Sequence, residues 1–276
     1  MTGWALEALA LLEQYAQRAP LPRVRRLHLP PTPEPDRQRG EFCALELDDG
    51  ALGLSYVLLG DTLPVLARGG VPVESVDALA LARGFVGGDT LRRTLGFAAI
   101  NALTRSLFDR AGFVVPKGAD SFGGLDPQPG DVIGMVGYFA PLIGRIVERG
   151  AKLVVIELRE DLVRDDGTVR VTTDARELAG CRKVMATGTM LLNDSLDAML
   201  AHCRGAAHLA LVGPSVGTPP DPLFARGVTL LGGTWVSDGA GFTDALVRGE
   251  PTGAFGWKSA LAAADYPGWA ALLARL

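Results

Sequence analysis

Cysteine is scarce in this chain of 276 residues, which holds only Cys43, Cys181 and Cys203. Their number is odd, and no two of them form a C-x-x-C pair. Such usage argues against a disulfide framework and is typical of proteins in a reducing cytoplasm. We therefore expect a cytoplasmic protein.

Histidine is equally scarce, and the three are His28, His202 and His208. No H-E-x-x-H or H-x-x-E-H motif is present, so the sequence gives no strong transition-metal site. Two weaker arrangements stay open. His28 and Cys43 lie on predicted strands that could approach each other, and an oxygen-rich site could use Glu157 or Asp238.

The chain also lacks a basic surplus and a long apolar run. Lys and Arg number 27 against 31 Asp and Glu, and the net charge of -4 supplies no basic field for nucleic-acid phosphates. No run reaches the ~18 apolar residues of a membrane span. Residues 1–20 carry Glu7 and Glu13 but no basic leader, which predicts an amphipathic helix ending before Pro20 rather than a signal peptide. Neither nucleic acid nor membrane is therefore an expected partner.

What is present predicts a globular α/β protein. Hydrophobic residues make up 48% and charged residues 21%, and the length suggests two domains. The pattern over residues 1–113 predicts a smaller α+β domain. We expect a hairpin that turns at Asp48-Asp49-Gly50 and a long helix with Asp89 as its N-cap. Its expected strand is 23–29 and its expected helices are 63–68, 76–82 and 90–110. Residues 114–130, rich in Gly and Pro, predict a linker.

Residues 131–276 predict a Rossmann-like domain. Near-continuous Val, Leu and Ile runs are typical of parallel strands that are buried on both faces. Five strands are expected at 131–137, 152–157, 182–187, 208–213 and 227–233. Helices at 141–149, 189–203 and 243–248 and a closing C-terminal helix complete a doubly wound sheet. Only the crossover over 159–180 is expected to be irregular.

Small and polar residues follow these strands, at the edge where an open parallel sheet binds its ligands. Glycine there lets a ligand approach the backbone, and free N–H groups favour an anion. We therefore expect a pocket on this rim. The candidates from the strand ends are Gly137, Tyr138, Glu157, Thr187, Gly188, Thr189, Gly213, Pro214 and Ser215. A further turn is expected at Gly232-Gly233-Thr234.

Some candidates have equally good structural explanations. Glu157 could bind a ribose, a metal or a basic group, or simply pair with Arg159 or Lys152. Thr189 is a candidate N-cap. Asn193 lies one turn further and could point at the rim, or it could cap or bind the neighbouring loop.

Asn101 lies in the apolar window FAAINAL of the long N-terminal helix. A buried amide without partners costs roughly 1–3 kcal/mol, so Asn101 should meet something polar. That partner is either backbone across the domain boundary or the ligand.

Familiar cofactor and nucleophile motifs are weak here. The first rim loop lacks G-x-G-x-x-G and has Pro141 at the helix start, so a nicotinamide site has little support. A site for a nucleoside such as that of S-adenosylmethionine has equally little support. Ser215 lies in G-P-S-V-G, which is not the G-x-S-x-G of a nucleophile elbow.

Several of these stretches resemble the family described as a putative heavy-metal chelation domain. The stretches are GDVIGMVGYFAPLI, LVVIELRED, VMATGTMLLNDSLDAML, LALVGPSVGTPPDPLFARGVTLLGGTWVSD and FAAINAL. The resemblance covers most of the chain and implies an enolase-N-terminal-like α+β domain before the Rossmann-like one. It also implies a pocket between the two domains. By position it adds Asn101, Asn193 and Asp238 to the rim candidates.

The leading hypothesis is a protein that binds a small anionic ligand or a metal complex in the cleft between the two domains. Backbone N–H groups of the Gly188-Thr189 and Pro214-Ser215 loops would hold the ligand, with Glu157 and Asn101 as side-chain contacts. The cofactor would be a metal ion or metal chelate, if there is one. The alternative is a small-molecule lyase or transferase that uses Glu157 as acid or base. A homodimer is the default assembly.

Overall fold

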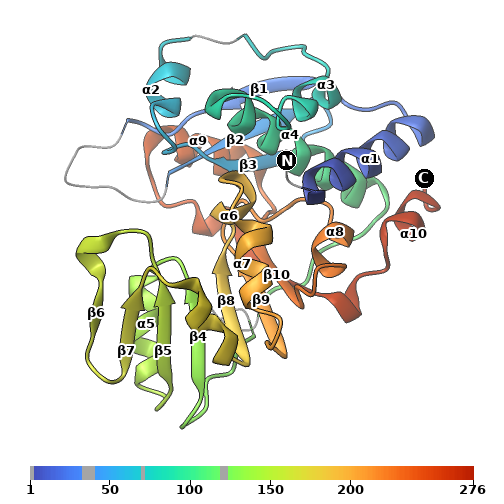
Figure 1. Cartoon of the computed structure of the whole chain (residues 1–276). Coiled ribbons are helices and arrows are strands. Elements are labelled where there is room, and N and C mark those ends of the chain that lie inside the picture. The colour runs from blue at the N-terminus through green and yellow to red at the C-terminus, as the bar shows by residue number, and fades with distance from the viewer. Residues whose placement is uncertain (1–2, 33–40, 70–71, 119–123) are drawn as a thin grey trace.

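A computed structural model describes residues 3–32, 41–69, 72–118 and 124–276. These residues form two sheets, one of three strands and one of eight (Figure 1). Residues 119–123 of the predicted linker lie outside the described part. The α/β class expected from the sequence is confirmed.

The N-terminal unit is a three-stranded antiparallel sheet with helices. The predicted hairpin forms, and Gly50 takes the positive φ of 86° that its turn requires. The elements are α1 (Gly3–Arg18), β1 (Val24–His28), β2 (Phe42–Leu47), β3 (Leu52–Tyr56), α2 (Thr62–Ala67), α3 (Ala78–Arg83) and α4 (Thr90–Arg110).

Helix α4 is the central element that joins this unit to the rest. Asp89 caps its start as predicted, because its carboxylate accepts a hydrogen bond of 2.8 Å from Arg92 N. The helix is buried nearly all round, which is typical of a helix in a core. A Cβ on Gly53 of β3 would come within 2.1 Å of Ala98 O, so only glycine permits this close contact between β3 and α4.

The large sheet has more strands than the sequence predicted. The strand order is β11-β10-β9-β8-β4-β5-β7-β6. The strands are β4 (Val132–Val136), β5 (Lys152–Ile156), β6 (Arg164–Asp165), β7 (Val169–Thr172), β8 (Lys183–Thr187), β9 (His208–Val212), β10 (Leu230–Val236) and β11 (Gly256–Ala262). The five predicted strands are parallel, and β7 extends them. The edge strands β6 and β11 are antiparallel.

Two further predictions need correction. Gly232-Gly233-Thr234 lies inside β10 rather than in a turn after it, because this strand starts and ends about three residues later than expected. The predicted helix over 189–203 is two helices, α6 (Thr189–Leu192) and α7 (Leu196–His202). The break falls at Asp194, whose φ of +63° is incompatible with a continuous helix.

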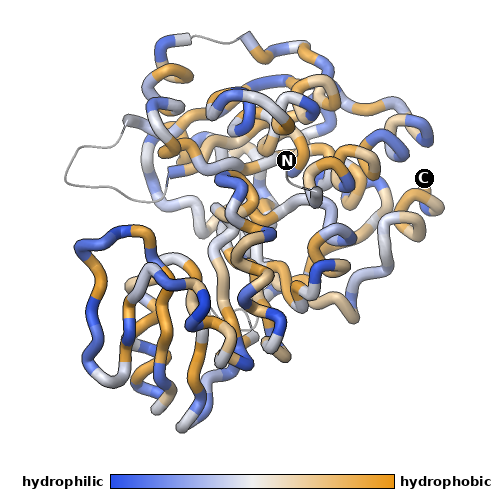
Figure 2. The backbone as a smooth tube through the Cα atoms, viewed as in Figure 1, coloured by the Kyte–Doolittle hydropathy of each residue, from blue (hydrophilic) through white to orange (hydrophobic). Residues whose placement is uncertain are grey.

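Helices cover both faces of the large sheet. Helix α5 (Ala140–Val147) lies behind β4, β5 and β7 in Figure 1, and α6 and α7 lie in front of the sheet. The remaining helices are α8 (Asp221–Phe224), α9 (Gly239–Arg248) and α10 (Trp269–Leu273). In Figure 2 the central strands are hydrophobic and the outer edge at β6 is largely hydrophilic.

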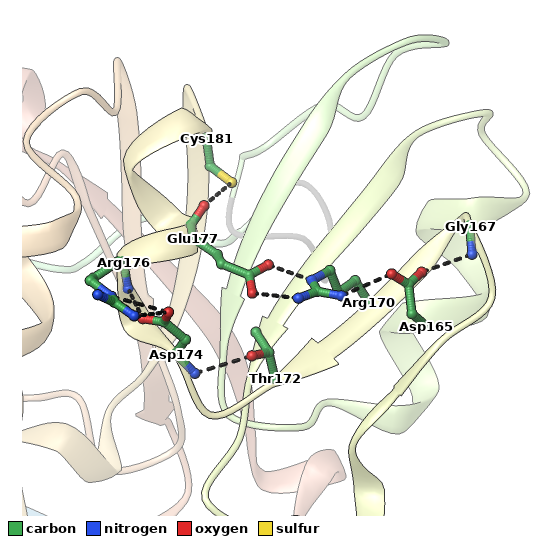
Figure 3. Close-up of polar contacts among 8 residues, drawn as sticks. All are labelled: Asp165, Gly167, Arg170, Thr172, Asp174, Arg176, Glu177 and Cys181. Atoms are coloured by element: carbon green, nitrogen blue, oxygen red, sulfur yellow. Dashed lines mark hydrogen bonds and ion pairs between the residues drawn. The ribbon is translucent and has the colours of Figure 1, made fainter.

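The crossover over 159–180 is irregular, as predicted. It holds only the two 3-10 turns at Glu160–Leu162 and Ala175–Gly180 and the strands β6 and β7. Ion pairs run along it (Figure 3). Arg170 binds Asp165 on one side and Glu177 on the other, at 2.9 and 2.6 Å.

One hydrophobic cluster extends through both predicted domains. It includes Leu12 of α1, Phe97 of α4, Leu191 of α6 and Trp269 of α10. The division into domains at 113 and 131 stays a prediction. In the part of the chain that is described, no helix is both long and apolar enough to cross a bilayer.

Candidate functional site

The predicted rim loops lie side by side because neighbouring parallel strands end at the same edge. A Cβ on Gly137, after β4, would lie 3.1 Å from Thr187 Cγ2 at the end of β8. Gly188 N donates to Val212 O at 2.8 Å, and Gly213 N donates to Gly232 O at 2.9 Å. The structure thus brings the first, third and fourth loops together.

The Thr187-Gly188-Thr189 turn satisfies much of its own hydrogen bonding. The hydroxyls of Thr187 and Thr189 are 3.0 Å apart, and Thr189 N donates to Thr187 Oγ1 at 3.3 Å. The N-cap of α6 is Gly188, so the prediction of Thr189 as the cap is wrong. Thr187, one residue before the cap, accepts a hydrogen bond from the first N–H of the helix.

Glu157 is held by the backbone rather than by a cation. Its Oε2 accepts a hydrogen bond of 3.0 Å from Tyr138 N, and its Oε1 accepts from Leu158 N and Arg159 N at 2.8 and 3.1 Å. Three N–H donors orient this carboxylate at the junction of the β4 and β5 loops. The Tyr138 hydroxyl accepts a bond of 3.1 Å from Arg164.

Asn193 and Asp238 both end or begin helices. Asn193 follows the last residue of α6, and its Oδ1 accepts from Ser195 N at 3.2 Å and from Ser195 Oγ at 2.6 Å. Asp238 is the N-cap of α9 and accepts from Gly241 N at 3.0 Å. Helix capping accounts for the side-chain contact of Asp238, and a local turn between α6 and α7 accounts for those of Asn193.

Asn101 bridges the two units. It is 3% exposed, and its Nδ2 donates to Leu54 O at 2.7 Å and to Ser215 O at 2.8 Å. Its Oδ1 is buried and accepts no hydrogen bond from the described protein groups. One of the two predicted alternatives, a backbone partner across the boundary, is therefore present. It serves only the Nδ2 end of the amide.

Asn101 lines the first of two pockets, which we call the small pocket. This cavity lies between the units and has a volume of about 60 Å³. Its polar lining comes from both units and is made up of Asn101, Arg105, Ser215, Thr218, Thr234 and Ser259. It is smaller than the about 300–1,000 Å³ usual for drug-sized ligands.

The second, which we call the large pocket, has a volume of about 590 Å³. It lies on the face of the sheet that α5 covers, beside the start of that helix. Its apolar lining includes Phe139, Leu142, Val212 and Leu230, and Lys258 is among its charged residues. Gly213 and Pro214 of the predicted rim also line it, and Pro214 lines both pockets.

Side-chain alternation along the strands explains why the large pocket exists. Leu230, Gly232 and Thr234 of β10 pair with Ala262, Ala260 and Lys258 of β11, so these six side chains share one face. Further into the sheet, on β4, this face carries larger residues such as Ile133 and Met135, which pack against α5. Glycine and alanine on β10 and β11 leave a hollow instead.

Sequence reasoning missed most of this lining. Lys258 and the alanines lie on β11, which was not predicted although WKSALA alternates in the manner of an edge strand. Lys117 and Arg105 carried no motif. Of the predicted rim residues, Gly137, Tyr138, Glu157, Thr187, Gly188, Thr189, Asn193 and Asp238 line neither of these two pockets.

Two sequence-family descriptions match the chain, and both read "Putative heavy-metal chelation". One covers residues 120–264, more than half of the chain, and the other covers residues 40–104. The chain belongs to this heavy-metal chelation family. An uncharacterized protein of Methanocaldococcus jannaschii is 29% identical over 152 residues, which are 54% of this chain. The match spans 57% of that relative's length.

Two solved structures of this family, both of unknown function, resemble the chain. The protein from Desulfitobacterium hafniense is 20% identical with a TM-score of 0.67, and the one from Pyrococcus horikoshii is 21% identical with a TM-score of 0.64. Each match covers 92% of this chain and 99% of the other. At these identities the likeness shows the fold.

The described residues of this family member include no group of three or more His, Cys, Asp or Glu side chains that could hold a metal ion. His28 and Cys43 do not build a site either. His28 Nε2 lies 2.8 Å from Glu46 Oε2, and burial raises the pKa of the Cys43 thiol to about 12. Burial also raises the pKa of Cys203 to about 11 and opposes the thiolate that a metal needs.

Proposed function

We propose that this protein binds an organic anion with an apolar body, either a free chelator or its metal complex, in the large pocket. The observation that carries the proposal is the pocket itself. Its about 590 Å³ falls within the range of small-molecule sites. Pockets of this kind are mostly apolar, with a few polar groups that orient the ligand.

The lining favours an apolar body. Phe139 and Leu142 form one wall, at the start of α5, and Val212 and Leu230 rise from the sheet. The floor between them carries small residues, including Gly232. An aromatic or aliphatic ring laid on this floor would bury apolar surface on both of its faces, which is worth about 25 cal/mol per Å².

The charged residues favour an anion. Lys258 shares the face of the floor, next to Ala260, and Lys117 and Asp265 also line the pocket. The Lys117 ammonium lies 5.1 Å from the centre of the Trp257 ring. A carboxylate or phenolate in the pocket would accept charge-assisted hydrogen bonds from these lysines.

The family description and the side chains then point to a chelator rather than a bare ion. A chelating molecule supplies its own metal ligands, so the protein needs only to recognise the shape and charge of the complex. This accounts for a heavy-metal chelation protein with buried, protonated thiols and few histidines.

Calorimetric titration can test this proposal with 2,3-dihydroxybenzoate, its iron(III) complex and Zn²⁺ alone. Two variants address the site. Ala260→Phe fills the floor of the pocket, and Lys258→Gln removes its cation. Lys152→Gln, an exposed lysine on β5, is the matched control for charge.

We expect the catechol or its iron complex to bind, with at least tenfold loss in Ala260→Phe, a smaller loss in Lys258→Gln and no change in Lys152→Gln. Circular dichroism would show that the variants fold. Equal affinity in wild type and Ala260→Phe would refute the site, and binding of Zn²⁺ but not of either organic probe would refute the ligand class.

A further inference from the structure

The floor of the large pocket is elongated, because it runs lengthwise along β10 and β11. The pair of Thr234 with Lys258 lies at one end of it, and the pair of Leu230 with Ala262 lies at the other. Four residue steps separate the two pairs on each strand, which corresponds to about 13 Å. A ligand that fills this floor therefore has two ends in different surroundings.

The end of the floor at Lys258 suits a negative charge. Lys117, which is bridged to Ser259, lines the pocket beside it. The start of α5 lies at the same edge of the sheet, and Phe139 and Pro141 of that start line the pocket as well. The N-terminus of a helix carries a partial positive charge, which adds to that of the ammonium groups.

The opposite end of the floor carries a carboxylate, that of Asp265. The chain leaves β11 after Ala262, where Ala263 N donates to Thr229 O at 3.1 Å, and then makes a 3-10 turn. Asp265 closes this turn, is exposed and lines the pocket. No group in the described part of the chain forms a hydrogen bond or an ion pair with its carboxylate. A cationic group of a ligand can therefore pair with it.

We infer that the ligand of the large pocket carries a protonated amine as well as its anionic group, with the anion at Lys258 and the amine at Asp265. This inference rests on the function proposed above and adds the chemistry of the ligand's second end. The ligand class is an amino carboxylate, or a similar zwitterion, whose apolar body lies on Gly232 and Ala260. Asp265 then determines specificity, because it favours an anion that bears an amine over one that does not.

The preference for the amine should be moderate and sensitive to salt. Asp265 is exposed, and an ion pair at an exposed carboxylate changes an affinity by a few-fold rather than by orders of magnitude. Salt screens such a pair, so the preference should shrink as the ionic strength rises.

Calorimetric titration of the full chain can test the inference with two probes that differ in one group. 4-(4-Aminobutyl)benzoate, the amine probe, carries a carboxylate, a ring and a terminal ammonium. 4-Pentylbenzoate, the methyl probe, has a methyl group in place of the ammonium. The two probes have the same number of non-hydrogen atoms, so the ratio of their affinities isolates the contribution of the amine.

Three variants assign the two ends of the ligand. Asp265→Asn removes the charge at one end and keeps the shape of the side chain, and Lys258→Gln removes the cation at the other end. Asp48→Asn is the matched control, because it alters an exposed aspartate in the hairpin turn of the N-terminal unit, outside both pockets.

We expect wild type to bind the amine probe more tightly than the methyl probe by about threefold or more. Asp265→Asn should remove this preference by weakening the amine probe alone, and Asp48→Asn should keep it. Lys258→Gln should weaken both probes by the same factor, because both carry the carboxylate.

Equal affinity of wild type for the two probes, or a preference that persists in Asp265→Asn, overturns the inference. A preference that is lost in Lys258→Gln does so too, since the amine would then not lie at Asp265. The proposed function survives these results where Ala260→Phe still abolishes binding. If 2,3-dihydroxybenzoate binds in the pocket and neither probe does, the inference alone is refuted. If none of the three binds, the proposed function and the inference are both refuted.

Discussion

The centre of the molecule and the outer edge of its large sheet are held together by different forces. At the centre, Leu12, Phe97 and Trp269 belong to one buried cluster that unites the first helix, α4 and the last helix. At the edge, around β6 and β7, exposed arginines pair with carboxylates (Figure 3). The centre is buried and apolar, whereas the edge is exposed to solvent and charged.

This difference indicates which part of the fold keeps the pockets rigid. Buried apolar surface contributes about 25 cal/mol per Å², whereas exposed ion pairs typically contribute under about 1 kcal/mol and are screened by salt. The small pocket and the loop of Pro214 and Ser215 rest on the central cluster through Asn101. Substitutions at the centre should therefore cost much more stability than substitutions at the edge.

The strongest test of the comparison is Trp269→Ala. Trp269 is 1% exposed, and its Nε1 donates to Leu11 O at 3.0 Å. Removing it should lower the free energy of unfolding by about 3–5 kcal/mol, since it leaves a large cavity and removes a hydrogen bond. Urea denaturation measures the change. Leu276→Ala, which alters a side chain that is 42% exposed at the same end of the chain, should cost under about 0.5 kcal/mol.

Gly53→Ala tests the tight contact of β3 with α4 and should have the next largest effect. Its methyl group would lie 2.1 Å from Ala98 O and 2.3 Å from Ala102 N, so strand and helix must separate. We expect a loss of about 1–3 kcal/mol in the free energy of unfolding. Gly144→Ala, in the open on α5, should instead stabilise by up to about 1 kcal/mol because alanine favours the helix. A loss in both variants would contradict the packing argument.

The sequence was sufficient to predict the elements whose patterns are local. The strands β4, β5, β8 and β9, the cap at Asp89 and the turn at Gly50 follow from hydrophobic runs, N-cap chemistry and glycine, all visible within a few residues. The first four rim loops were also placed at one edge correctly, whereas the fifth lies inside β10. Parallel order alone fixes that placement.

The pockets could not be predicted, because they depend on which strands become neighbours. Gly232 and Ala260 make a floor only when β11 pairs antiparallel with β10 in the register that places them opposite each other. The direction of the Asn101 amide is fixed only because two carbonyls from separate parts of the chain, those of Leu54 and Ser215, accept hydrogen bonds from its Nδ2. The two contacts of Asn101 join residues that are 47 and 114 positions apart in the chain.

The smallest expected effect is the acid sensitivity of the sheet edge. The hydrogen bond from Arg170 lowers the pKa of Glu177, and that from Arg176 lowers the pKa of Asp174 to about 2. Carboxyls with lowered pKa values stabilise the fold above their unfolded pKa, near 4, and lose this contribution as the pH falls toward their folded pKa. Stability at the edge should therefore decline between about pH 4.5 and pH 2.

The melting temperatures of Glu177→Gln and wild type, compared at neutral pH and near pH 3, measure this contribution. Glu177→Gln should melt slightly lower at neutral pH and lose less than wild type on acidification, because one of the titrating carboxyls is gone. Glu148→Gln, which alters an exposed glutamate after α5, should follow wild type at both pH values. If Glu177→Gln instead costs as much stability as Trp269→Ala, the edge is not the weakly held region inferred here.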